Sequence, residues 1–265
     1  MNEVTEKSGI DTGLRLEDDI QLKKETNFKQ MLKRLAKNKL AVTGGIVFLI
    51  LCLISLCAPL IAPYDYSAID PANKYLRPCA EHLFGTDQYG RDIFSRVIYG
   101  GRWSLTLGLA STLVSTFLGV IVGSIAGYFG GKVDMIIMRF IDIVQCIPGI
   151  LLTICISVVL GSGVVNTVIA MSFGSIWGTA RMLRGQILMV RESEYVEAAR
   201  ATNVSSFRTI VKYVLPNSIQ QTIIGACMSI GGMITQISGL SFLGLGVQPP
   251  LPEWGAMLSD GRNFL

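Results

Sequence analysis

Cys79 and His82 are the residues whose side chains and spacing could bind a metal ion. Both could approach one soft ion as ligands, because sulfur and imidazole nitrogen suit such ions. Structural metal sites generally need four ligands, so the pair alone predicts no metal site. His82 is the only histidine, and no Ser or Cys stands near a plausible base. The sequence therefore predicts no catalytic residues and no enzyme activity of the chain itself.

A glycine-rich segment, residues 127–133, superficially resembles a phosphate-binding loop. Ala126 occupies the first glycine position of that motif, and Val133 replaces the Ser or Thr that would hold magnesium. No strand precedes the segment. We therefore expect no nucleotide or other cofactor on this chain, and interpret the glycines as the end of a membrane span.

The composition of the chain predicts the kind of secondary structure in which these residues lie. The 265 residues are 50% hydrophobic and only 16% charged, whereas soluble domains carry about 25% charged residues. Charged residues are absent from four stretches, 40–64, 103–131, 143–180 and 218–252. A helix needs roughly 20 residues to cross the hydrocarbon core, and the third stretch divides at Gly161-Ser162-Gly163. The sequence predicts an all-α integral membrane protein, a polytopic bundle of five spans.

Lys and Arg set the orientation, because they resist translocation. They crowd the segment before the first span: Lys23, Lys24, Lys29, Lys33, Arg34, Lys37 and Lys39. The resulting organisation is a cytoplasmic tail (1–39), a first span (40–63), an extracytoplasmic loop (64–102) and a membrane core (103–265) with a cytoplasmic loop (181–217). The net charge of +4 is interpreted as this topology signal, next to anionic lipid, and not as nucleic-acid binding.

Small residues line one face of the second span. Gly119, Gly123 and Gly127 recur every four residues, a spacing that lets another helix approach closely in lipid. We expect them to pack against a helix instead of lining a pore. Pro148 is expected to kink the third span near its start.

The predicted cytoplasmic loop contains two short helices. Residues 191–202 are rich in strong helix formers, and Asn203 suits the left-handed conformation that ends a helix. Ser205 can cap a second helix, and Pro216 marks entry into the fifth span. The adjacent small residues Ala198 and Ala199 would allow close contact by a partner.

This loop resembles the signature of the membrane subunits of ATP-binding-cassette importers. Glu197-Ala198-Ala199 and Leu215-Pro216 match its positions, while Asn203 replaces a glycine and Tyr213 replaces an isoleucine. Further matches resemble the oligopeptide, dipeptide and nickel C-type subunits: residues 83–92, 100–105, 127–134, 181, 184–186, 240–246 and 254–255.

The resemblance implies a permease of the type I importer kind in a prokaryotic cell membrane. Its partners would be a second permease subunit, two ATPase subunits that bind ATP and magnesium, and an extracytoplasmic substrate-binding protein. The helix carrying Glu197, Ala198 and Ala199 would be the coupling helix that contacts an ATPase. A turn-forming role stands beside a subunit or binding-protein contact for six residues: Gly85, Thr86, Asp87, Gly90, Arg91 and Asp92.

Three functions follow as alternatives. The first is uptake of di- or oligopeptides, the second is uptake of nickel or a nickel chelate, and the third is a non-transporting membrane subunit. The third is favoured only because a sixth span is missing. Members of this family usually have that span after the position of Leu265. The chain ends where that span would begin, as expected either of a truncated chain or of a five-span variant.

Overall fold

The computed structural model describes residue 36 and residues 38–262. The chain divides into two compact units, residues 1–53 and 54–265. Regular secondary structure in the described part is helical, apart from one isolated bridge between Thr86 and Asp92. The all-α prediction is confirmed. Most of the predicted cytoplasmic tail, residues 1–35 and 37, lies outside the described residues.

Helix α3 (Lys39–Leu56) is the first predicted span. It contains no charged residue after Lys39, and its apolar side chains are largely exposed within this chain, which suits a helix surrounded by lipid. Pro59 lies at the start of the short helix α4 (Ala58–Ile61), and the 3₁₀ turn η1 (Pro71–Asn73) follows in the connecting segment.

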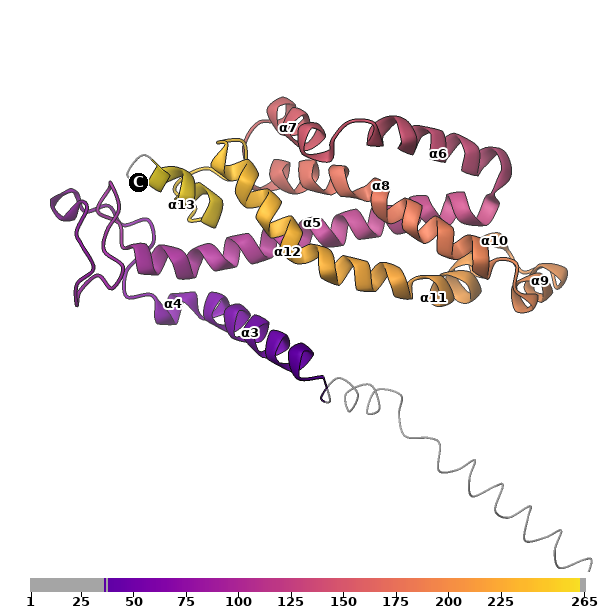
Figure 1. Ribbon diagram of the computed structural model, residues 1–265, viewed down its shortest axis with the longest axis horizontal. Coiled ribbons are helices and arrows are strands. Elements are labelled where there is room, and N and C mark those ends of the chain that lie inside the picture. The colour runs from indigo at the N-terminus through magenta and orange to yellow at the C-terminus, as the bar shows by residue number, and fades with distance from the viewer. Residues whose placement is uncertain (1–35, 37, 263–265) are drawn as a thin grey trace, which may run out of the picture. The chain divides into compact units, whose positions relative to one another are not determined.

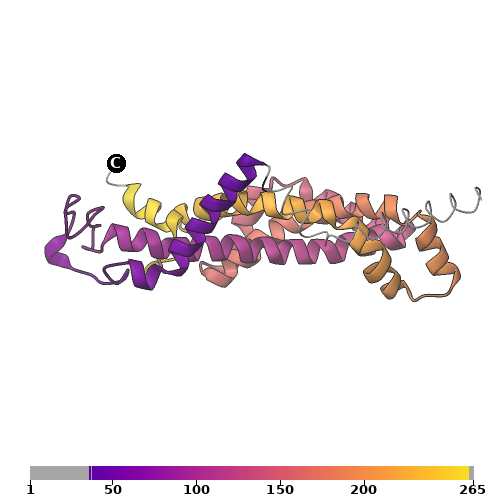
Figure 2. The same ribbon diagram turned by 90° about the horizontal axis from the view of Figure 1, so that it is seen from below.

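The second unit contains a helical bundle (Figure 1). Its long helices are α5 (Ile93–Phe129), α8 (Val164–Val190) and α12 (Gln220–Phe242), and α6 (Gly131–Gln145) and α7 (Gly149–Leu160) pack beside α8. Short helices lie at the two ends: α9 (Glu194–Ala201), α10 (Ser206–Thr209), the π-helical turn η2 (Ile210–Val214), α11 (Leu215–Ser218) and α13 (Trp254–Gly261). Both views place α9 and α10 at the end of α5 opposite α13 (Figures 1 and 2).

Helix α5 is longer than the sequence predicts. The charge pattern places the start of the span at Trp103, but α5 begins at Ile93, where the Asp92 carboxylate accepts the Ser95 backbone N–H at 2.7 Å. Residues 93–102, the last part of the predicted extracytoplasmic loop, are therefore helical. At 37 residues α5 is about 55 Å long, so it extends beyond a hydrocarbon core of about 30 Å. The extra helix contains Arg96, which is buried by protein.

The third predicted span is broken. Residues 132–142, which lie between the second and third uncharged stretches, belong to helix α6, and α7 leaves it at an angle of 86° after a short break. Pro148 lies at the N-cap of α7, as expected of a residue that interrupts the helical hydrogen-bond ladder. The kink near Pro148 is confirmed, with a larger bend than a kinked continuous helix would have.

Three described helices, α3, α5 and α12, are long and apolar enough to cross a membrane, and the bent pair α6–α7 makes a fourth if it counts as one span. Helix α8, the predicted fourth span, has 27 residues and is not among them. It packs against α5, α6, α7, α11 and α12, so protein covers much of its surface and it needs less hydrophobicity than a lipid-facing helix. By length and composition, the described residues therefore contain three or four candidate spans, whereas the sequence predicts five.

The glycine stripe of α5 packs against α8. A Cβ atom at Gly119 would lie 2.7 Å from Cβ of Thr179, and one at Gly123 would lie 2.6 Å from the carbonyl oxygen of Ala180. At Gly127 the added atom would lie 2.8 Å from Cβ of Ile187. Only glycine leaves room for this approach of the two helices.

Candidate functional site

The loop between α8 and α12 forms one end of the bundle. Helix α9 is amphipathic: Val196 and Ala199 are buried, and Val196 packs in a cluster with Tyr128, Leu183 and Ile187 of α5 and α8. Arg200 places its guanidinium 4.9 Å from the centre of the Tyr128 ring. The loop helix thus packs directly against α5 and α8, the two long helices that meet at the glycine stripe of α5.

Asn203 ends α9 in the left-handed conformation that the sequence predicts, with φ of 56°. The Val204 N–H donates to the Ala199 carbonyl at 3.1 Å, and the Asn203 N–H donates to the Arg200 carbonyl at 3.0 Å. This pair of bonds is the Schellman motif, which satisfies carbonyls left free at a helix C-terminus. The replacement of glycine by asparagine therefore preserves the turn.

The small pair on α9 is divided between two faces. Glu197 and Ala198 are exposed, whereas Ala199 is buried against the chain itself. The expectation that both alanines contact a partner is corrected for Ala199: helical spacing turns it toward the bundle. The surface available to a partner at this helix is the Glu197 and Ala198 face.

The second half of the loop is helical from Ser206 to Ser218, through α10, η2 and α11. Ser205 occupies the N-cap position, but its side chain makes no capping hydrogen bond. Leu215 is half-buried and packs near the cluster around Val214, while Pro216 is exposed in the first turn of α11. Pro216 thus marks the entry to the next long helix, as predicted.

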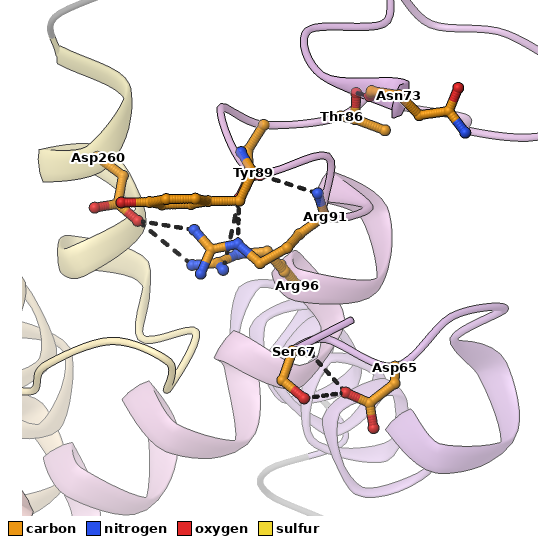
Figure 3. A network of polar contacts seen from close by, with 9 residues as sticks. Asp65, Ser67, Asn73, Thr86, Tyr89, Arg91, Arg96 and Asp260 are labelled. Atoms are coloured by element: carbon orange, nitrogen blue, oxygen red, sulfur yellow. Dashed lines mark hydrogen bonds and ion pairs between the residues drawn. The ribbon is translucent and has the colours of Figure 1, made fainter. Parts of the chain in front are cut away.

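A network of charged side chains closes the opposite end of the bundle (Figure 3). Arg91 and Arg96 are both buried, and each faces Asp87 on one side and Asp260 of α13 on the other. The shortest of these contacts joins Nε of Arg91 to Oδ2 of Asp87 at 2.6 Å. Two buried cations are therefore balanced by two carboxylates, and α13 is tied to the segment before α5.

The six residues predicted as a turn or a contact lie within residues 85–92, the segment that supplies Asp87 and Arg91 to this network. Gly85 and Gly90 have φ of 76° and 75°, and a Cβ at Gly90 would lie 1.8 Å from the Asp70 carbonyl oxygen. The Thr86 hydroxyl donates to the Asn73 carbonyl at 2.5 Å. The turn-forming role is present in the structure, and the contact role remains a prediction.

Cys79 and His82 contact each other, and His82 also contacts neighbouring side chains of the segment before α5. Nδ1 of His82 lies 2.9 Å from Oδ1 of the buried Asp92, and its ring lies 4.8 Å from the Tyr64 ring centre. The Cys79 sulfur accepts the His82 backbone N–H at 3.4 Å. Among the described residues no group of three or more His, Cys, Asp or Glu side chains is arranged to hold a metal ion.

In the segment after α4, hydrogen bonds from Ser67 lower the pKa of the exposed Asp65.

Glu253 is a fully buried carboxylate that the sequence analysis did not single out. Its Oε1 accepts the hydroxyls of Ser104 on α5 and Ser238 on α12, each at 3.2 Å, and its Oε2 accepts the Ala256 N–H at the start of α13. The adjacent Trp254 donates its indole N–H to the Val97 carbonyl at 3.0 Å. One carboxylate thereby connects α5, α12 and α13.

Ion pairs join α6 to α8. Arg184 makes a two-point contact with Asp134, with Nε 2.9 Å from Oδ1, and Nη2 of Arg181 lies 2.5 Å from Oδ1 of Asp142. Nη1 of Arg139 also lies 3.7 Å from Oδ2 of Asp142, so both carboxylates of α6 are paired.

The arrangement of a membrane bundle with an exposed loop helix agrees with the comparison to known proteins. The family described as binding-protein-dependent transport system inner membrane component matches residues 119–262, more than half of the chain. The N-terminal TM domain of oligopeptide transport permease C matches residues 26–78. The chain belongs to the binding-protein-dependent permease family.

Individual relatives resemble this permease over most of their length. A dipeptide transport system permease protein of Alkalihalophilus pseudofirmus is 41% identical over 90% of this chain and 78% of its own. A glutathione transport system permease protein of Pectobacterium atrosepticum is 39% identical, covering 90% and 79%. An oligopeptide transport system permease protein of Bacillus subtilis is 37% identical, covering 94% and 81%. The protein is therefore a multi-pass membrane permease of a transport system.

The loop helix of this permease was found from sequence, whereas the charged network was only half found. Asp87 and Arg91 were named, but Arg96 and Asp260 were not. Arg96 lies three residues after the beginning of α5, in a stretch that the charge pattern assigned to a loop. The available signal was the N-cap residue Asp92, which marks a helix start ten residues before the apolar stretch.

Proposed function

We propose that this chain is one of two permease subunits that together enclose the pathway of an ATP-driven importer of di- or oligopeptides. An extracytoplasmic binding protein would deliver the peptide, and two ATPase subunits would bind ATP and magnesium. This chain would contribute no nucleotide site. Its part would be to change conformation when an ATPase moves α9.

The relatives' names support peptides as the substrate class. They include dipeptide, D,D-dipeptide and oligopeptide transport systems, together with glutathione, itself a tripeptide. The packing of His82 against Asp92 and Tyr64 gives the nickel alternative no support of its own. Peptide uptake is therefore the function that we favour.

The observation that carries the coupling role is the exposed Glu197 and Ala198 face of α9. This face is held rigidly, because the same helix buries Val196 and Ala199 against the bundle and ends in a hydrogen-bonded turn. A rigid lever between a surface contact and packed helices can transmit a displacement into the membrane. We place this end of the bundle, and the N-terminus, on the cytoplasmic side, because cations concentrate in residues 23–39 and 181–217.

Paired uptake measurements test the substrate class. Cells with and without the gene, containing the partner ATPases and binding protein, are supplied with a labelled dipeptide and with labelled nickel. Loss of dipeptide uptake alone is the expected result. Loss of nickel uptake alone would replace the peptide proposal with the metal alternative, and unchanged uptake of both would contradict a transport role.

Charge reversal at Glu197 tests the coupling role. Glu197→Lys should abolish most dipeptide uptake and reduce co-purification of the ATPase subunits, because it places a cation at the centre of the proposed contact. Glu81→Lys, a reversal at an exposed residue of the opposite end, is the matched control and should leave the ATPases bound. Full uptake and full ATPase binding in Glu197→Lys would exclude α9 as the coupling helix.

A further inference from the structure

Two adjoining hollows lie between α7, α8 and α12. The first, of about 390 Å³, is lined by small or uncharged polar residues and by one apolar residue, Ile150: Gly149, Ile150, Thr153, Gly174, Ser175 and Gln236. The second, of about 240 Å³, shares Ile150, Thr153 and Gln236 with the first and is otherwise lined mainly by apolar side chains such as Met171 and Leu240. The first hollow is therefore mainly polar and the second mainly apolar, and the three shared residues lie between them.

The hollows lie within the depth that a membrane would cover. Gly174 precedes Arg181, the first charged residue of α8, by two helical turns, or about 10 Å. Gly225 of α12 faces the Met182 side chain, so it lies level with Arg181, and Gln236 lies three turns beyond it, or about 16 Å. Both distances place the polar groups well inside a hydrocarbon core of about 30 Å.

Gln236 is the polar group that requires a partner. Its side chain is exposed, and within the described chain its carboxamide makes no hydrogen bond, although it offers two donors and one acceptor. The neighbouring hydroxyls of Thr153 and Thr235 do bond, to the carbonyls of Gly149 and Gly231. An unpaired amide facing hydrocarbon costs several kcal/mol, so Gln236 must face something other than lipid.

The chemistry of the lining indicates the occupant. A carboxamide pairs equally well with a peptide N–H and a peptide C=O, and it does so whatever the side chain of the substrate. No Asp, Glu, Lys or Arg lines either hollow, so neither sign of substrate charge is selected. The adjoining apolar hollow, with the flexible side chain of Met171, suits varied apolar side chains.

We infer that these two hollows form a binding site for the translocated peptide, in which Gln236 pairs with the peptide backbone and the apolar hollow accepts a side chain. This inference rests on the proposed function as a peptide permease. It identifies α7, α8 and α12 as walls of the pathway. It also assigns Gln236 as the residue that binds peptides without regard to their sequence.

The test compares variants of the assembled transporter, with its partner permease, ATPases and binding protein. Gln236→Leu should lower dipeptide uptake about tenfold, as expected when one hydrogen bond to substrate is lost in a low-dielectric site. Gln236→Asn, which keeps the amide, should retain more uptake than Gln236→Leu. Gln221→Leu removes an exposed amide from the same helix outside both hollows and should leave uptake unchanged.

Two further measurements separate a substrate contact from a structural role. Co-purification of the second permease and binding-protein-stimulated ATP hydrolysis should both be normal in Gln236→Leu. Normal uptake in that variant, or loss of the second permease from the complex, would overturn the inference. Absence of dipeptide uptake by the unsubstituted transporter would instead contradict the proposed function, so the two failures are distinguishable.

Discussion

Single residues set the local geometry on which both ends of the bundle depend. Asn203 adopts a positive φ that most L-residues avoid, and Asp260 supplies one of two carboxylates around buried Arg91 and Arg96. Asn203 could be predicted from sequence, because its conformation is a property of the residue and its immediate neighbours. Asp260 could not, because its partner Arg91 lies 169 residues away in the chain and only the fold brings them together.

Substitution at Asn203 should separate conformation from side-chain chemistry. Asn203→Gly should preserve stability, whereas Asn203→Val should destabilise the loop by roughly 1–2 kcal/mol, because a β-branched residue is strained at φ of 56°. Thermal unfolding of the purified permease and protease cleavage near residue 203 measure the difference. Equal stability of the two variants would show that the turn is not under this constraint.

Removal of one charge from the network should loosen α13. Asp260→Asn leaves two buried guanidinium groups with only the Asp87 carboxylate, so we expect a loss of about 1–3 kcal/mol. Hydrogen exchange of the backbone amides of α13 should increase. Asp65→Asn, at an exposed carboxylate bonded to Ser67, is the control and should leave α13 protected.

The bounds of a helix were predicted well where its apolar stretch is continuous. They were predicted less well where the helix is surrounded by protein instead of lipid. Helix α12 lies within its predicted stretch, and α3 begins one residue before its own. The polar start of α5 was missed because Arg96 is neutralised by Asp87 and Asp260 instead of being solvated by water. Pro148 is the only local signal for the 86° bend before α7. The size of the bend also depends on how α7 packs against α8, and the local sequence does not specify this packing.

The glycine stripe should make the α5–α8 contact intolerant of even one added methyl group. In Gly123→Ala the new Cβ would lie 2.6 Å from the Ala180 carbonyl oxygen, so the helices must separate and stability should fall by about 1–3 kcal/mol. Gly178→Ala, on an open face of α8, should be neutral or stabilising by about 0.5–1 kcal/mol. Thermal unfolding in detergent measures both, and equal shifts would argue against close packing as the role of Gly123.

Across the bundle, the two ends differ in the kind of contact that they can offer. At one end α9 presents an exposed, helical surface with Glu197 and Ala198, while at the other the charges of Arg91 and Arg96 are buried and paired with Asp87 and Asp260. The exposed side chains of the second end include apolar ones, such as Phe84 and Tyr89, as well as the charged Glu81. This asymmetry fits a permease that is moved from one side of the membrane and receives substrate at the other.

The assignment of the two ends to opposite sides of the membrane can be measured directly with cysteine labelling. Cys79 is exposed in the segment before α5, so a membrane-impermeant maleimide added to intact cells or spheroplasts should label it. Cys79→Ser should remove that signal. An Arg208→Cys change in α10, made in the Cys79→Ser background, should react only after the membrane is permeabilised, because α5 and α8 place α10 at the opposite end of the bundle. Labelling of both positions from outside would contradict the orientation, and with it the proposal that α9 contacts an ATPase in the cytoplasm.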